Sequence, residues 1–176
     1  MRDAGPGLVA AGPSSDATPI DDLLLLVGRL NYAWTNTESL LIHLIAGLAR
    51  TDKDSAVIVF LTLNTGRARI DLVERLAKLD RTDAAEKAGV LDITARLTKL
   101  SGLRNRFSHS MYAFDQETGT TRTIMMRIAD RKDAIRVGRS DVVDVDAIHD
   151  VEAAIRGLAA LNHDIWTHIG RFAYPT

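Results

Sequence analysis

The sequence has no cysteine, almost no net charge and no long apolar run, and each absence excludes a class of protein. Without cysteine there is no disulfide framework, no thiolate metal site and no cysteine nucleophile, which fits a reducing compartment. A net charge of −1 argues against a protein that coats nucleic acid, because such proteins use a broadly basic surface. The longest apolar runs are Leu23–Val27 and Ala56–Leu61, whereas a membrane span needs about 20 residues.

The N-terminal residues lack the apolar core of a signal peptide, so we expect a cytoplasmic protein with no membrane segment. A length of 176 residues, with 46% hydrophobic and 26% charged residues, is typical of one globular domain. Residues 1–17 are rich in Gly, Ala, Ser and Pro and have no apolar period. They predict a disordered tail in front of a single domain over residues 18–173.

Apolar residues at alternating steps of three and four predict one long helix from Thr18 to about Arg50. Thr18 would cap this helix, and Pro19 would take its first position. The stripe consists of Ile20, Leu23, Val27, Leu30, Trp34, Leu41, Leu44 and Leu48, with Thr37 at the one skipped position. This spacing is typical of a helix in a bundle.

Further helices are predicted over residues 55–63, 66–79 and 83–108, and from Ser140 or Asp141 onward. Segment 55–63 is apolar and β-branched, so its period alone does not separate helix from strand, and the flanking helices favour helix. A break of the third helix at Gly89 stays open. Short strands over 111–115, 121–128 and 134–137 predict a small β-hairpin or three-stranded insertion at about residues 111–139. The predicted fold class is all-α: an up-and-down bundle of four or five helices with this insertion.

Residues suited to phosphate chemistry gather at the end of the helix predicted over 83–108. The stretch from Arg96 to His109 holds four cations and no acid. A cationic stretch in a nearly neutral chain is where an anion would bind. Arg104 offers a planar fork of donors for a phosphate, and His109 can accept or donate a proton near neutral pH. Asn105, four residues before His109, lies on the same helix face and can orient the imidazole or a phosphate oxygen.

The run from Arg104 to His109 reads R-N-R-F-S-H: an arginine, a polar residue, three further residues and a histidine at a helix end. It resembles the motif of the HEPN family of nucleotide- and RNA-binding helical domains. The resemblance implies a metal-independent endoribonuclease without a cofactor, of the kind found among toxins and antiviral or stress effectors. It implies RNA as substrate, a homodimer in which two motifs face one cleft, and an antitoxin or nucleotidyltransferase as a further partner. Arg104, Asn105 and His109 would be catalytic, and Lys99, Arg106 and Tyr112 would bind the substrate.

The chemistry of RNA cleavage suits these side chains. RNA carries its own nucleophile, the 2′-OH, so cleavage needs a proton acceptor, charge stabilisation and positioning, and its products are a 2′,3′-cyclic phosphate and a 5′-OH. Side chains five residues apart diverge by about 140° on an ideal helix, so Arg104 and His109 converge only if the helix ends first or a dimer pairs them. In family members silenced by a nucleotidyltransferase, a tyrosine stands two residues after the histidine. That position is Met111 here and Tyr112 follows it, so silencing by that route is not expected.

Other interpretations stay open. The chain could be a non-catalytic nucleotide- or RNA-binding module or a helical protein-interaction module, in which Arg104 and His109 serve only binding. It could also be a structural dimer, in which the arginines are surface cations at a helix C-terminus and His109 is its polar cap. Glu38, one turn after Trp34, is either a buried acid that orients a partner or a boundary residue. The lone pair His149 and Glu152 does not predict a metal site.

Overall fold

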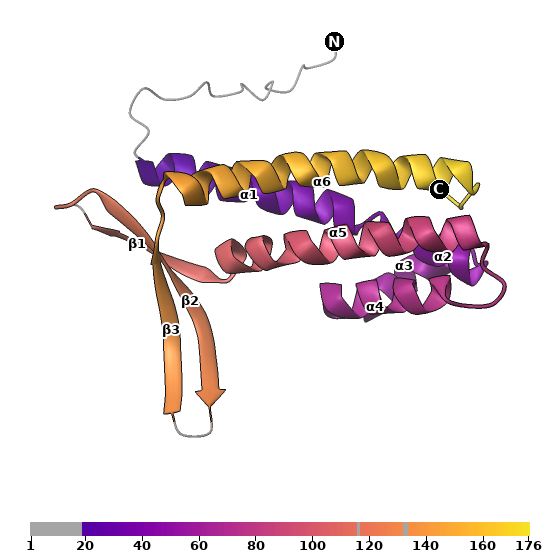
Figure 1. The fold of residues 1–176 in the computed structure, drawn as a ribbon, viewed down its shortest axis with the longest axis horizontal. Coiled ribbons are helices and arrows are strands. Elements are labelled where there is room, and N and C mark those ends of the chain that lie inside the picture. Colours follow the sequence, from indigo (N-terminus) through magenta and orange to yellow (C-terminus); the bar gives the residue numbers. More distant parts are fainter. Residues whose placement is uncertain (1–18, 116, 132–133) are drawn as a thin grey trace, which may run out of the picture.

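The computed structural model describes residues 19–115, 117–131 and 134–176 (Figure 1). The chain there is mostly helical, with a small antiparallel sheet before the last helix. The helices are α1 (Pro19–Glu38), α2 (Leu41–Ala49), α3 (Lys53–Thr62), α4 (Gly66–Ala77), α5 (Ala84–Ser108) and α6 (Val145–Arg171), and the strands are β1 (Ser110–Asp115), β2 (Thr120–Arg131) and β3 (Ala134–Val142). The predicted tail, residues 1–17, and the predicted cap Thr18 lie outside the described residues.

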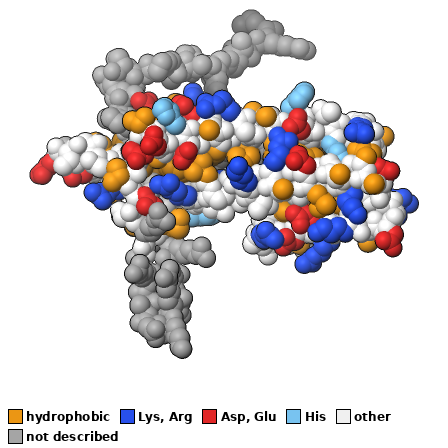
Figure 2. All heavy atoms as spheres, in the orientation of Figure 1, with side chains coloured by type: hydrophobic (Ala, Val, Ile, Leu, Met, Phe, Trp, Pro, Cys, Tyr) orange, Lys and Arg blue, Asp and Glu red, His pale blue; other side chains and the backbone are white. Residues whose placement is uncertain are grey.

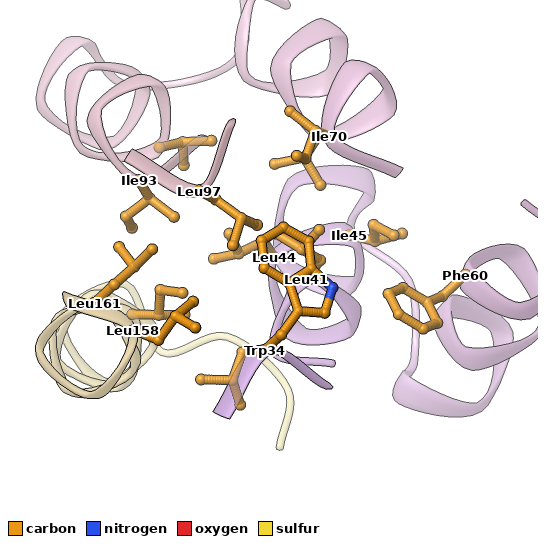
Figure 3. Packing of buried hydrophobic residues seen from close by; sticks show 14 of the residues in the cluster. Trp34, Leu41, Leu44, Ile45, Phe60, Ile70, Ile93, Leu97, Leu158 and Leu161 are labelled. Carbon is orange, nitrogen blue, oxygen red and sulfur yellow. The ribbon is translucent and has the colours of Figure 1, made fainter. Parts of the chain in front are cut away.

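The helices share one hydrophobic core. Figure 3 shows Trp34 of α1 pointing into this core among leucines of α2, α5 and α6. Leu41, Leu97 and Leu158, from those three helices, are all 0% exposed. Each fully buried leucine contributes about 1.5–3 kcal/mol relative to an exposed one, so the packing of α1 against α2, α5 and α6 holds the frame together. Within the described residues, every helix is too short or too polar to cross a lipid bilayer.

The prediction of one helix from residue 18 to residue 50 is wrong, because the chain turns between α1 and α2. The backbone N–H of Leu40 donates to the carbonyl of Thr37 (3.2 Å), a tight bond that ends the α-helical ladder. The Thr37 hydroxyl donates to the carbonyls of Ala33 (2.8 Å) and Leu158 (3.3 Å). The turn contains neither proline nor glycine, and the apolar stripe continues through it, so the sequence pattern does not reveal it.

The other predicted helices before the sheet are confirmed. The segment predicted over 55–63 is helical up to Thr62, the last residue of α3, and Asp52 caps this helix by accepting from the backbone N–H of Ser55 (2.8 Å). Helix α4 begins after Thr65, whose hydroxyl accepts from the N–H of Ala68 (3.1 Å). Helix α5 begins after Asp83 and passes Gly89 without a break.

The three strands form one antiparallel sheet in the order β1-β2-β3. Met111 pairs with Ile124, and Arg122 pairs with Val142, with a register shift between Met125 and Ile128. The predicted insertion is confirmed, but β3 extends to Val142. The last helix therefore does not start at Ser140 or Asp141, as predicted. Asp144 caps it instead, because pairing with β2 holds residues 140–142 in the sheet.

Candidate anion-binding site at the end of α5

A pocket of about 490 Å³ lies where the end of α1, the start of α4 and the last turns of α5 meet. It contains all three residues predicted to be catalytic, namely Arg104, Asn105 and His109. The full lining is Trp34, Glu38, Asn64, Thr65, Gly66, Arg67, Arg69, Ile70, Thr98, Ser101, Arg104, Asn105 and His109. The fold thus adds residues of α1 and α4 to the motif of α5.

Arg104 is the cation in the pocket that lacks an acidic partner within the described residues. Its Nη1 donates to Oδ1 of Asn105 (3.0 Å), and its guanidinium carbon lies 5.5 Å from the centre of the Trp34 ring. Its Nε is buried and has no hydrogen-bond partner in the described part of the chain. A buried donor without an acceptor costs about 1–3 kcal/mol, and Nε is out of reach of a ligand in the pocket, so an anion would contact the terminal nitrogens of the guanidinium. Arg104 is therefore prepared for a phosphate or a carboxylate.

His109 is the residue at which α5 ends. Its backbone N–H donates to the carbonyl of Asn105 (3.2 Å), and its φ of −116° and ψ of 20° leave the helical region. Its side chain is exposed. Because the helix stops at Ser108, the divergence expected on an ideal helix does not apply, and His109 lines the same pocket as Arg104.

Asn105 supports Arg104 more directly than it supports His109. Its side-chain oxygen accepts the hydrogen bond from Arg104, and in the described residues its side chain makes no hydrogen bond to the imidazole. The amide NH₂ of Asn105 therefore remains able to donate to a ligand in the pocket.

Residues of α1 and α4 form the rest of the pocket wall. Glu38 is 9% exposed, and its carboxylate accepts from Nε1 of Trp34 (3.0 Å) and pairs with Nη1 of Arg69 (3.3 Å). Arg69 is further fixed by a hydrogen bond from its Nε to the carbonyl of Phe60 (3.1 Å). Of the two interpretations of Glu38, the buried acid with a partner is the correct one. No periodicity marks Arg69 as its partner, because the two residues are far apart in the chain.

Gly66 allows α4 to begin directly beside Glu38. A Cβ at this position would lie 2.6 Å from Oε1 of Glu38, so any other residue would displace the carboxylate. The start of α4 also brings its positive helix dipole and Arg67 to the pocket, although Arg67 is paired with Asp71 (2.9 Å). Neither residue carries a sequence signal that would have placed it at this site.

Lys99, Arg106 and Tyr112, predicted to bind the substrate, do not line this pocket. Lys99 is exposed on α5. The Nε of Arg106 is buried and has no hydrogen-bond partner in the described residues. Its Nη2 lies 3.9 Å from Oδ2 of Asp141, a residue of β3. The Tyr112 hydroxyl donates to the carbonyl of Phe107 (2.5 Å), and burial raises the pKa of this hydroxyl. Arg106 and Tyr112 thus connect the end of α5 to the sheet.

Comparisons with protein-family models, with curated proteins and with solved structures gave no match to this chain. The functional conclusion therefore depends on the pocket and on the motif that it contains.

Proposed function

We propose that this protein is a HEPN-like, metal-independent endoribonuclease built on a helical bundle, with its active site in the pocket at the end of α5. The observation that supports this most is that Arg104, which has no acidic partner among the described residues, lines the same pocket as His109. Figure 2 shows basic and acidic side chains interspersed over the described part of one face, so a local site fits this molecule better than a broad basic coat.

Each motif residue has a role in cleavage. Arg104 binds the scissile phosphate and stabilises the negative charge that grows on it. His109 moves a proton, because an imidazole exchanges protons near neutral pH. Asn105 holds the guanidinium through its side-chain oxygen and offers its NH₂ to a phosphate oxygen. The 2′-OH attacks the phosphorus, which yields a 2′,3′-cyclic phosphate and a 5′-OH.

The biological setting follows from the family resemblance alone. It comprises a cytoplasmic homodimer, a role as a toxin or as an antiviral or stress effector, and control by an antitoxin or a nucleotidyltransferase. These are proposals about partners that the pocket itself does not specify.

A second candidate is a module that binds nucleotides or RNA without cleaving them. It is favoured by the bond between Asn105 and Arg104, which orients the guanidinium and leaves the His109 ring without a hydrogen bond from Asn105 in the described residues. This candidate uses the same pocket, so the two functions differ in turnover and not in binding.

The test is incubation of the purified protein with total RNA in EDTA, beside His109→Ala and the control His149→Ala. His149 is an exposed histidine of α6 outside the pocket. We expect the wild type and the His149→Ala control to cleave the RNA and to leave cyclic phosphate ends. We expect His109→Ala to leave the RNA intact while keeping the thermal midpoint of the wild type. RNA binding without cleavage at any pH would support the second candidate. If Arg104→Ala bound and cleaved RNA to the same extent as the wild type, both candidate functions of the pocket would be contradicted.

A further inference from the structure

We propose that Glu38 is the general base of the pocket, so that one chain holds both proton-transfer groups of the reaction. This inference rests on the proposed ribonuclease function. In the step, the 2′-OH gives its proton to the Glu38 carboxylate while O2′ forms a bond to phosphorus. The bond from phosphorus to O5′ breaks, and the His109 imidazolium gives a proton to that leaving oxygen.

The reaction moves two protons, and the motif on α5 supplies one group that can exchange them. Among the side chains that line the pocket, Glu38 supplies the carboxylate and His109 the imidazole, which are the side-chain types that act as general acids and bases. The arginines remain protonated, and hydroxyl and amide groups are poor bases. Glu38 is therefore the complement to His109 within a single pocket.

The position of Glu38 relative to the phosphate site is set by Trp34. The indole Nε1 donates to Oε2 of Glu38, and the Arg104 guanidinium lies 5.5 Å from the centre of the same ring. The carboxylate and the phosphate-binding cation are thus held by one rigid side chain that is itself 3% exposed. Glu38 comes from the end of α1 and His109 from the end of α5, so the base and the acid enter the pocket from different elements.

The contacts of Glu38 fix its carboxylate and still leave it able to accept a proton. A carboxylate has about four acceptor positions, and Trp34 and Arg69 occupy two. Gly66 presents no side chain to Oε1, which would otherwise meet a Cβ at 2.6 Å. A buried acid that served only to join α1 to α4 would not need to line the pocket that holds the motif.

The experiment separates the base from the acid with two labelled RNA oligonucleotides of the same mixed sequence. One is ordinary RNA, and the other has sulfur in place of the bridging 5′-oxygen at one position. A thiolate leaves without being protonated, so the sulfur substrate needs the base and does not need the acid. On ordinary RNA, we expect Glu38→Gln and His109→Ala each to lower kcat/KM by about 10²–10⁴-fold. On the sulfur substrate, His109→Ala should recover towards the wild type, and Glu38→Gln should not.

Glu38→Gln retains an acceptor for Nε1 of Trp34, so this variant removes the base and keeps that contact. Formate should restore cleavage by Glu38→Ala, because a small acid can enter the space left by the side chain. Glu74→Gln, which breaks a partly exposed ion pair between Glu74 of α4 and Lys78 outside the pocket, is the matched control and should match the wild type. If Glu38→Gln does not fold, Glu38→Asp with the formate-treated alanine variant gives the same answer, since a structural acid is not restored by formate.

The failures are distinguishable. A Glu38→Gln rate within twofold of the wild type on ordinary RNA, with an inactive His109→Ala, overturns the role of Glu38 and leaves the ribonuclease intact. Recovery of Glu38→Gln in place of His109→Ala on the sulfur substrate reverses the two roles and also overturns the proposal. No cleavage of either RNA by the wild type overturns both the proposed function and this inference.

Discussion

The pocket at the end of α5 and the groove beside the end of α6 both contain arginines, but they use them differently. The groove, about 300 Å³ in volume, lies between α2, the start of α5 and the segment after α6. There, Nη2 of Arg81 donates to the carbonyl of Leu48 (3.0 Å), and the Tyr174 hydroxyl donates to Glu86 (2.5 Å). In the pocket, Arg104 keeps a buried donor without an acceptor in the described residues.

Because of this difference, we expect different effects when each of the two arginines is removed. The Arg81 side chain donates a hydrogen bond to the Leu48 carbonyl of α2, so its removal takes away a contact within the fold. Arg104 donates to its chain neighbour Asn105 and lies over the Trp34 ring, so its removal should affect the pocket more than the fold. The following predictions test this contrast, from the largest expected effect to the smallest.

The largest effect should come from Arg104→Ala. We expect cleavage to fall by about 10²–10³-fold, as is typical when one charge-stabilising donor is removed, with an unchanged midpoint of unfolding. Initial rates on labelled RNA and a thermal melt measure both quantities. Arg81→Ala is the matched control: its cleavage rate should be that of the wild type, while its free energy of unfolding falls by about 0.5–1.5 kcal/mol. A loss of cleavage in both variants would contradict the contrast.

The second effect concerns Gly47, against which the Tyr174 ring packs. A Cβ at position 47 would lie 2.2 Å from the ring, so Gly47→Ala must displace Tyr174 from the groove. We expect the free energy of unfolding to fall by about 1–3 kcal/mol, measured by urea denaturation, with cleavage unchanged. Gly102→Ala is the control, because a Cβ there meets nothing within 4 Å and alanine favours a helix by about 0.5–1 kcal/mol. A stability of Gly47→Ala equal to that of the wild type would show that the groove contributes little.

A third effect is the pH dependence of stability from the groove region. Burial lowers the pKa of His168, whose Nε2 has no hydrogen-bond partner in the described residues. The unfolded chain therefore binds a proton more readily, so stability should fall as the pH drops below about 6.5 towards the lowered value. Urea midpoints at stepped pH measure this, and His168→Gln should flatten the acidic side.

At alkaline pH, the Tyr174 hydroxyl should make the stability fall as the pH rises. Burial and the hydrogen bond to Glu86 raise its pKa. The unfolded chain loses that proton near pH 10 and the folded chain keeps it, so stability should fall above about pH 10. Tyr174→Phe should lose this decline. An alkaline decline of the same size in Tyr174→Phe would assign it to other groups.

The smallest effect should come from Lys99→Ala. Lys99 is exposed and lies outside the pocket, so it can contribute only a long-range attraction to the RNA backbone. We expect the slope of log affinity against log salt to change by less than about 0.7, the value for one phosphate contact on a single strand. Filter binding at several salt concentrations measures the slope. A larger change, with loss of cleavage, would place Lys99 in the active site after all.

Much of the helical frame could be predicted because its signals are local. Helix α4 begins after the cap Thr65 and helix α5 after the cap Asp83, and each helix has apolar residues at helical spacing within its own sequence. The turn after Glu38 could not be predicted, since it depends on the contact of Thr37 with Leu158, which is distant in the chain. The start of α6 was misplaced because Asp141 and Asp144 are equally suited to cap a helix, and only the pairing of β3 with β2 decides between them.

The site shows the same division. Arg104, Asn105 and His109 form one short run, so a sequence motif identifies them together. The other side of the pocket is assembled from Glu38 and Gly66, whose proximity arises only when α1 and α4 pack. Lys99 and Arg106 share the local charge of the motif, and helix geometry directs them away from the pocket.

One consequence of the junction between α5 and β1 concerns how the protein could be controlled. His109 is the single residue between the last residue of α5, Ser108, and the first of β1, Ser110. The Ser110 hydroxyl and the Tyr112 hydroxyl donate back to the carbonyls of Arg106 and Phe107, both at 2.5 Å, which stiffens this junction. A movement of the sheet would therefore be passed on to His109. An engineered binder that tilts the strands would change the orientation of the imidazole through the single peptide bond between His109 and Ser110, without contacting the RNA.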